Sequence, residues 1–216
     1  MKRLAFLLIV LFAMSSCCTM KIHQGDLLFQ DLRCGPLCDA IDQATYGYNG
    51  YNINHMGIVV RRGMRKYVLE AYKKVQLTPL HKFLYRSTDE NGRPLVIVGR
   101  LKPQYRYLLP KAIDYGLSLV GKPYDSVFVL NNGAYYCSEL IYEMFKHANN
   151  GKDFFPVYPM NFKSLKTGQI PQVWKQYFAK YNMYVPQYQM GCNPADYSRS
   201  KKIQIVAQCG KMRKTK

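Results

Sequence analysis

Hydrophobic residues recur along this chain with the two periods that distinguish strands from helices. Short apolar or alternating runs predict four strands, near residues 26–30, 53–60, 66–72 and 95–101. Helical spacing predicts helices near 110–120, 137–148 and 171–181, and the second of these carries one apolar stripe made of Leu140, Ile141, Met144, Phe145 and Ala148. The pattern therefore predicts an α+β fold, in which a small antiparallel sheet packs against helices.

The strands at 53–60 and 66–72 flank Gly63 and form a predicted β-hairpin. If the loop is 62–63, or the four residues 61–64, the numbers of paired residues add up to 125 and His55 lies directly opposite Glu70. A slip of one residue would place the two side chains on opposite faces. An imidazole beside a carboxylate can be the oriented base of a catalytic triad, and it is also an ordinary cross-strand pair.

The start of the chain has the composition of an export signal. Lys2 and Arg3 precede an uncharged run at 4–14, and small residues stand before Cys17, as in the cleavage site of a bacterial lipoprotein. The run is shorter than the roughly 20 residues that span a bilayer. We therefore predict a signal peptide at 1–16, lipidation of Cys17 with Cys18 as the alternative, a tether at 17–24 and a single domain at 25–216. Such a protein would be lipid-anchored in the cell envelope, facing the periplasm or the exterior.

The formal net charge of +18 narrows the set of expected partners. Without Lys2 and Arg3 the chain still has 29 bases against 13 acids, and a field of this sign attracts anionic molecules. In an exported protein these would be phospholipid head groups, lipopolysaccharide and cell-wall polymers rather than nucleic acid. Seven of the bases lie between Arg199 and Lys216 with no acid among them, so this end of the chain is either a cationic binding arm or a solvated tail.

The cysteines fall into groups if the compartment is oxidising. Cys34 and Cys38 bracket "CGPLC", and Cys192 and Cys209 lie near the end of the chain, so two local bridges can form although the sequence does not fix the pairing. Cys137 is left over at the start of the helix predicted for 137–148, where the helix dipole favours a thiolate. It is therefore a candidate nucleophile, with a small core residue as the alternative.

The histidines do not have the spacing of a metal site. His23, His81 and His147 are scattered, and none lies at a short ligand spacing from another His or Cys. The glycine-rich loops that bind nucleotide phosphates are also missing from the sequence. We therefore expect neither a metal nor another cofactor.

The segments "GDLLFQ", "HMGIVV", "VLEAY", "GKPYD" and "YYCSELIY" occur in this order along the chain. Together they resemble the circularly permuted papain-like enzymes of the YiiX type, which are relatives of the NlpC-type cell-wall amidases. Ordinary papain-like chains place the cysteine before the histidine, whereas the permuted family reverses that order, as this chain does. The resemblance extends from about residue 25 to at least residue 206, and "CGPLC" is a segment that we cannot assign to the family pattern.

The resemblance implies a site and a reaction. Cys137 would be the nucleophile, His55 its general base and Glu70 the residue that orients His55. The hydroxyl of Tyr124, which without the family would be part of a turn, would stabilise an oxyanion together with the backbone N–H of Cys137. The implied reaction is hydrolysis of an amide bond, in short peptides or amino-acyl amides related to cell-wall peptide. Two alternatives stay open: an acyltransferase or lipase acting on phospholipid or other lipid acyl chains, and a catalytically silent binding module of the envelope.

Overall fold

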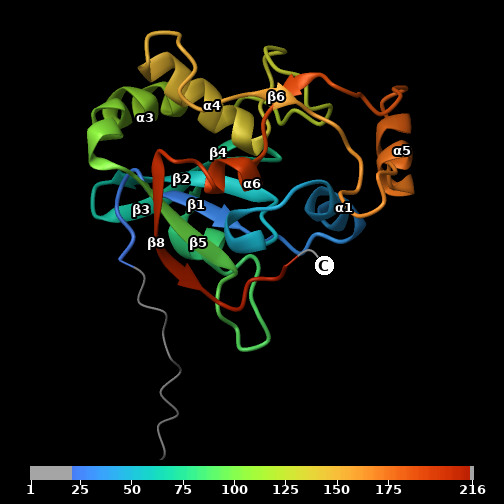
Figure 1. Cartoon of the computed structure of the whole chain (residues 1–216). Coiled ribbons are helices and arrows are strands. Elements are labelled where there is room, and N and C mark those ends of the chain that lie inside the picture. Colours follow the sequence, from blue (N-terminus) through green and yellow to red (C-terminus); the bar gives the residue numbers. More distant parts are fainter. Residues whose placement is uncertain (1–20, 215–216) are drawn as a thin grey trace, which may run out of the picture.

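An antiparallel sheet forms the centre of the molecule (Figure 1). The computed structural model describes residues 21–214. In spatial order the strands are β4 (Lys74–Pro79), β3 (Arg65–Tyr72), β2 (His55–Arg62), β1 (Leu27–Gln30), β5 (Val96–Leu101) and β8 (Ile203–Cys209). A separate ribbon pairs β6 (Tyr158–Pro159) with β7 (Met190–Gly191). The predicted α+β fold with a small antiparallel sheet is confirmed, and β1, β2, β3 and β5 lie where the sequence indicated strands.

Helices cover both faces of this sheet. α3 (Leu109–Ser118) and α4 (Cys137–Ala148) pack on one face, whereas the short α2 (Leu80–Leu84) packs on the other. α1 (Pro36–Ala44) and α5 (Gln172–Ala179) contact each other beside the sheet (Figure 1). The remaining elements are α6 (Pro194–Ser198) and 3-10 turns at Tyr48–Gly50 and Pro103–Leu108. Of the helices in residues 21–214, none has both the length and the apolar character needed to cross a membrane.

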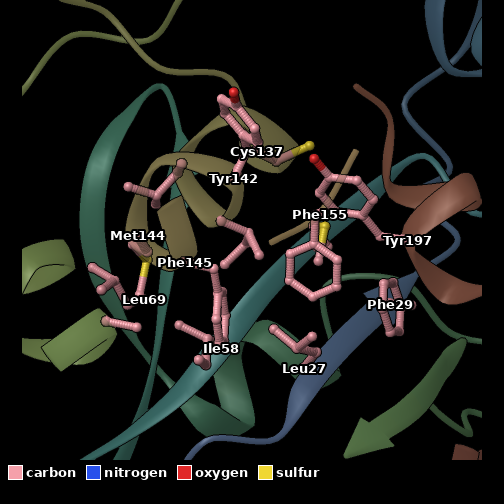
Figure 2. Close-up of a cluster of buried hydrophobic side chains, with 14 of the residues drawn as sticks. Leu27, Phe29, Ile58, Leu69, Cys137, Tyr142, Met144, Phe145, Phe155 and Tyr197 are labelled. Carbon is pink, nitrogen blue, oxygen red and sulfur yellow. The ribbon is translucent and has the colours of Figure 1, made fainter. Parts of the chain in front are cut away.

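The main core lies between α4 and the sheet (Figure 2). The whole apolar stripe predicted for this helix is buried, namely Leu140, Ile141, Met144, Phe145 and Ala148. The stripe meets Leu27, Phe29, Ile58 and Leu69, which project from three neighbouring strands because alternate residues of a strand share one face. Cys137, the first residue of α4, lies at the edge of this cluster and is 6% exposed.

The hairpin differs from the predicted one by two residues in register. β2 and β3 pair Ile58 with Leu69 and Arg62 with Arg65, so the numbers of paired residues add up to 127 rather than 125. Gly63, with φ 57°, therefore begins the turn, and a glycine at this position suits a type II′ turn. A difference of two keeps every side chain on its predicted face. His55 consequently shares a face with Glu70, as a diagonal rather than a direct neighbour.

The basic end of the chain is not a free arm. Residues 203–209 form β8, an edge strand beside β5, and buried or half-buried residues alternate with exposed ones along it. The alternation starts at Ile203 and ends at Cys209, both buried. The segment therefore forms a strand despite the basic residues on either side of it. The interpretation of 199–216 as a cationic arm or a solvated tail is therefore wrong for β8 and for the residues up to Arg213, which enters a buried cluster.

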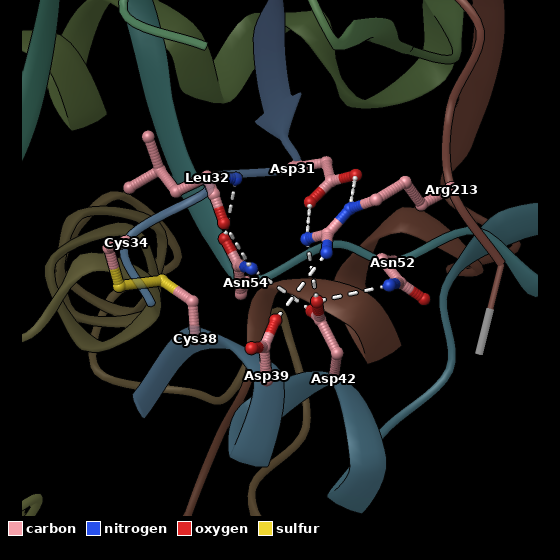
Figure 3. The surroundings of a disulfide bond; sticks show 9 residues. All are labelled: Asp31, Leu32, Cys34, Cys38, Asp39, Asp42, Asn52, Asn54 and Arg213. Carbon is pink, nitrogen blue, oxygen red and sulfur yellow. Dashed lines mark hydrogen bonds and ion pairs between the residues drawn. A yellow bond between two sulfur atoms is a disulfide. The ribbon is translucent and has the colours of Figure 1, made fainter. Parts of the chain in front are cut away.

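That cluster joins the end of the chain to β1 and α1 (Figure 3). The Arg213 guanidinium donates to both oxygens of Asp31, at 2.8 and 2.5 Å, and to Asp42 at 3.0 Å. Asn52 and Asn54 each donate to Asp42 at 3.0 Å. Burial and the neighbouring charge of Asp31 nevertheless raise the pKa of Asp42 to about 7. Three segments that are distant in sequence therefore share one polar centre.

One of the two possible local disulfides is present. Cys34 and Cys38 are bridged at the start of α1, with a Cα–Cα distance of 5.4 Å (Figure 3). Cys192 and Cys209 are not joined to each other, because Cys192 packs against the residue before α4 whereas Cys209 ends β8 opposite Val96.

The predicted signal peptide at 1–16 and the lipidation site Cys17 lie outside the described residues. Of the predicted tether at 17–24, the last four residues are described, and they lie against the sheet. Ile22 is 4% exposed and belongs to the apolar cluster under α2, while its carbonyl accepts a hydrogen bond from Lys66 at 2.6 Å.

Candidate active site

His55 and Glu70 meet on the sheet face that α2 covers. The Nε2 atom of His55 lies 2.5 Å from Oε2 of Glu70, and both side chains are buried. Continuing the register places Gly57 opposite Glu70, and a Cβ at Gly57 would lie 2.5 Å from a methyl group of Val68 and 3.1 Å from the Cβ of Glu70. The absence of a side chain at Gly57 therefore makes room for the diagonal contact, which is present despite the difference in register.

Glu70 receives two further partners that the sequence did not reveal. Thr78 donates to Oε1 at 2.5 Å, and Arg86 donates to both oxygens, at 2.6 and 2.8 Å. The guanidinium also stacks on Tyr72, 4.0 Å from its ring centre. Burial by itself raises the pKa of a carboxyl group, but the hydrogen bonds from Arg86 and His55 lower that of Glu70 to about 2. Glu70 is thus a fixed anion behind His55.

Cys137 approaches the other side of the same imidazole. His55 is the first residue of β2, so its ring lies at the end of the sheet, where it hydrogen-bonds with the Cys137 thiol. Because Nε2 faces Glu70, Nδ1 is the nitrogen left for the sulfur. Burial would lower the pKa of His55, but the hydrogen bonds with Cys137 and Glu70 and the charge of Glu70 raise it to about 9. The ring is therefore imidazolium at neutral pH, which is the form that stabilises a neighbouring thiolate.

The start of α4 adds further polarity around the sulfur. The first N–H groups of a helix have no partner within the helix and point toward groups at its start. Glu139, in the first turn, accepts from the backbone N–H groups of Tyr136 and Asn131, each at 3.3 Å. Burial raises the pKa of Glu139 to about 8, so its carboxyl group is mostly protonated at neutral pH and places little negative charge beside Cys137.

Tyr124 is fixed next to Cys137 by main-chain hydrogen bonds on both sides. Residues 121–123 bond to Val75 of β4 at 2.9 Å and to Tyr135 at 3.0 Å, which ties them both to the sheet and to the chain just before α4. Burial and the nearby Cys137 raise the pKa of Tyr124 well above its usual value. The side chain therefore stays a phenol, which can donate a hydrogen bond. The structure thus brings together all four predicted site residues.

Cys137 and Tyr124 line one cavity of about 220 Å³. Its far wall comes from the segment around β6 and β7, which is attached to the start of α4. Ser138 donates to the carbonyl of Cys192 at 3.0 Å, and the backbone N–H of Cys192 donates to the Tyr136 hydroxyl at 3.1 Å. Sequence reasoning did not find this wall, because its residues come from several separate segments.

A helix that begins with cysteine, and an antiparallel hairpin that supplies histidine and a carboxylate, define a papain-like hydrolase with a permuted chain. The family model described as "Permuted papain-like amidase enzyme, YaeF/YiiX, C92 family" matches residues 21–207. The chain therefore belongs to this family, Peptidase C92, and it is a hydrolase of the cysteine peptidase or amidase class.

Two proteins of Escherichia coli are similar to this chain. YiiX of strain K12 is 31% identical over 126 residues, which are 57% of this chain and 57% of that protein. The crystal structure of "metalloprotein yiiX from Escherichia coli O157:H7" superposes with a TM-score of 0.68 at 24% identity, covering 88% of this chain and 98% of that one. The word metalloprotein refers to the protein of Escherichia coli O157:H7. Within residues 21–214 of the present chain, no group of three or more His, Cys, Asp or Glu side chains is arranged to hold a metal ion.

Proposed function

We propose that Cys137, His55 and Glu70 act as a triad that hydrolyses amide bonds in short peptides or amino-acyl amides related to cell-wall peptide. The observation that carries the proposal is the unbroken series of contacts that runs from Arg86 through Glu70 and His55 to Cys137. The amidase family to which the chain belongs supports an amide as the bond that is cleaved.

The reaction would proceed in two steps. In the first, the Cys137 thiolate attacks the carbonyl carbon, and the C–N bond breaks as the His55 imidazolium gives its proton to the leaving amine. The developing oxyanion would accept hydrogen bonds from the Tyr124 hydroxyl and the backbone N–H of Cys137. In the second step, neutral His55 takes a proton from water, the resulting hydroxide attacks the thioester, and the carboxylic acid leaves while the thiolate and imidazolium are restored.

The pH dependence of Cys137 alkylation by iodoacetamide tests the pair without a substrate. Mass spectrometry of the labelled peptide would follow the reaction in the wild type and in His55→Ala. We expect the wild type to react at neutral pH and His55→Ala to react much more slowly, because the thiolate loses its imidazolium partner. A thiol that reacts equally in both proteins would contradict the proposed triad.

A panel of amino-acyl and dipeptide amides would then test turnover. We expect product and a transient acyl-enzyme on Cys137 in the wild type and neither in Cys137→Ala. Tyr124→Phe should lower kcat by about 10²-fold if its hydroxyl binds the oxyanion. An unchanged rate in Tyr124→Phe would mean that this residue is only part of the turn and does not bind the oxyanion.

Acyl transfer from lipid is the second candidate, and the apolar lining of the cavity favours it. Radiolabelled phospholipid would leave its acyl group on Cys137 if the enzyme used lipid esters. A strict amidase would show no such label.

We also propose that the protein is anchored in the cell envelope through lipid on Cys17, on the basis of the sequence at 1–17. Intact-mass measurement of the protein from membranes would show cleavage before Cys17 and the added lipid. Retention of residues 1–16, or cleavage without a lipid, would contradict this proposal.

A further inference from the structure

The cavity beside Cys137 has an aromatic wall. Phe128, Tyr136, Phe162 and Trp174 all line it, and their rings pack against one another rather than standing free. Phe128 meets Tyr136 edge to face at 5.5 Å between ring centres, and Phe162 meets Trp174 in the same way at 4.8 Å. Such contacts hold the rings in place, so the wall is formed before any ligand binds.

The backbone of Phe128 is strained where its ring joins this wall. Its φ is 58°, in the left-handed region that bulky residues rarely adopt. The carboxylate of Asp125 accepts hydrogen bonds from the N–H groups on either side, those of Val127 at 2.8 Å and Val129 at 2.7 Å. A strained residue over-determined by its surroundings is typical of ligand sites. The fold therefore fixes the Phe128 ring in the wall of the cavity that Tyr124 and Cys137 also line.

The charge of the cavity differs from that of the molecule. The chain has 31 lysines and arginines, yet none of those within residues 21–214 lines the cavity. Among the residues that line the cavity, Asp196 is the one aspartate, glutamate, lysine or arginine, and it is paired with Arg199. A carboxylate or phosphate on a ligand side chain would therefore find no lysine or arginine in the wall of this cavity to compensate its desolvation.

The volume suits one side chain of moderate size. A dry apolar cavity of roughly 150 Å³ accommodates benzene, and the present cavity measures about 220 Å³. A benzyl or isobutyl group fits this volume together with part of the adjoining backbone, whereas a methyl group would leave most of it empty.

We infer that this cavity is the specificity pocket for the acyl side of the substrate, and that it selects a neutral aromatic or branched aliphatic side chain next to the scissile carbonyl. Phe128 is the specificity-determining residue at its centre. The inference rests on the proposed function, because it requires Cys137 to be the nucleophile.

Matched N-acetyl amino aldehydes test this selection in the full-length protein. An aldehyde adds to the thiol to give a hemithioacetal and so protects Cys137 from iodoacetamide. The series would carry the side chains of alanine, leucine, phenylalanine and glutamate, and the concentration giving half protection would be measured by mass spectrometry. We expect the leucine and phenylalanine aldehydes to protect at about 10-fold lower concentration than the alanine aldehyde, and the glutamate aldehyde to show no such gain.

Two variants place the selection in the cavity. Ala44→Phe adds a ring to the lining, and Phe128→Gly removes one while suiting the positive φ. Both should reduce the ratio between the alanine and phenylalanine aldehydes toward one. Because the ratio is taken within each protein, any change in thiol reactivity cancels. Tyr107→Ala, at an exposed residue that does not line the cavity, should keep the wild-type ratio. If Phe128→Gly does not fold, Ala44→Phe carries the test.

The outcomes separate this inference from the proposed function. Equal protection by all four aldehydes, or best protection by the glutamate aldehyde, would overturn the neutral specificity pocket while His55-dependent alkylation still supported the triad. A wild-type ratio that survives in Ala44→Phe would also overturn it. Alkylation of Cys137 that does not depend on His55 would overturn the proposed function, and the inference with it.

Discussion

Two buried networks of arginine and carboxylate adjoin each other in this molecule, and the pKa values of their central carboxyl groups are shifted in opposite directions. Glu70 is bound by Arg86, Thr78 and the His55 imidazolium, and its pKa is lowered to about 2. Asp42 shares the single guanidinium of Arg213 with other aspartates, and its pKa is raised to about 7. Both carboxyl groups are buried, so burial alone does not decide the charge. The number of cations available to each carboxyl group in the network decides it.

The two networks come close at the neighbouring residues Asn54 and His55. Asn54 donates to Asp42 and also lines the cavity, whereas His55 belongs to the network of Glu70. The Glu70 network keeps its carboxylate charged and holds the His55 ring in place. The Asp42 network ties separate segments of the chain together and can take up a proton near neutral pH. The following substitutions test this difference, from the largest expected effect to the smallest.

Glu70→Gln should have the largest effect, on the rate rather than on folding. We expect kcat/KM for an amide to fall by about 10³-fold or more, because the imidazolium loses the anion that orients and stabilises it. Glutamine can still accept a hydrogen bond from Arg86. The loss of unfolding free energy should therefore be smaller than the increase in the activation free energy of the reaction. Glu90→Gln, at an exposed carboxylate, is the control and should leave the rate unchanged. Equal rates in Glu70→Gln and the wild type would remove Glu70 from the mechanism.

Arg86→Met should come next, and it acts on stability. It leaves the Glu70 anion buried without its bidentate partner, which should cost about 3 kcal/mol of unfolding free energy. Arg86→Lys should recover part of this loss, since an ammonium keeps the charge but not the two parallel hydrogen bonds. Urea unfolding would measure both, with Arg65→Met at an exposed position as the control. A loss no larger than that of Arg65→Met would mean that Arg86 does not hold Glu70.

Arg213→Met should cost less, about 2 kcal/mol, because its side chain is 31% exposed and the cluster can respond by binding a proton. The loss should be larger at pH 8 than at pH 5, where Asp42 is already protonated and needs the guanidinium less. Lys211→Met removes a nearby exposed cation as the control. A loss that is the same at both pH values would contradict the uptake of a proton by Asp42 near neutral pH.

The smallest effect is the pH dependence that Asp42 itself contributes. Its pKa in the folded state, about 7, lies above the value of 3.8 for the free group, so the folded protein binds a proton that the unfolded chain has lost. This contribution is fully present below pH 4 and is lost as the pH rises through 7, and between pH 6 and pH 8 the loss is on the order of 1 kcal/mol. Subtracting the stability curve of Asp42→Asn from that of the wild type isolates it. Parallel curves between pH 4 and 8 would show that Asp42 does not change its protonation on folding.

The sequence predicts the parts of this molecule that depend on local period and order of motifs. The bounds of α4 and its buried stripe follow from helical spacing, and the contact of His55 with Glu70 follows from the hairpin because an error of two residues preserves the face. Arg86 and Thr78 were missed, since they reach Glu70 through the packing of α2 and β4, for which the chain offers no spacing signal. β8 was missed because a charge run was given more weight than a short alternation of apolar residues.

The position of β8 has a consequence for biosynthesis. The strand that covers the outer edge of β5 and the cation that neutralises Asp31 are both supplied by residues 203–213, so a nascent chain that has not yet released them has an unpaired sheet edge and an unbalanced acidic cluster. Exposed strand edges are templates for association between chains. The molecule can therefore complete its fold only after residues 203–213 have left the ribosome, and ribosomal products that stop before β8 should be recognised by chaperones and proteases.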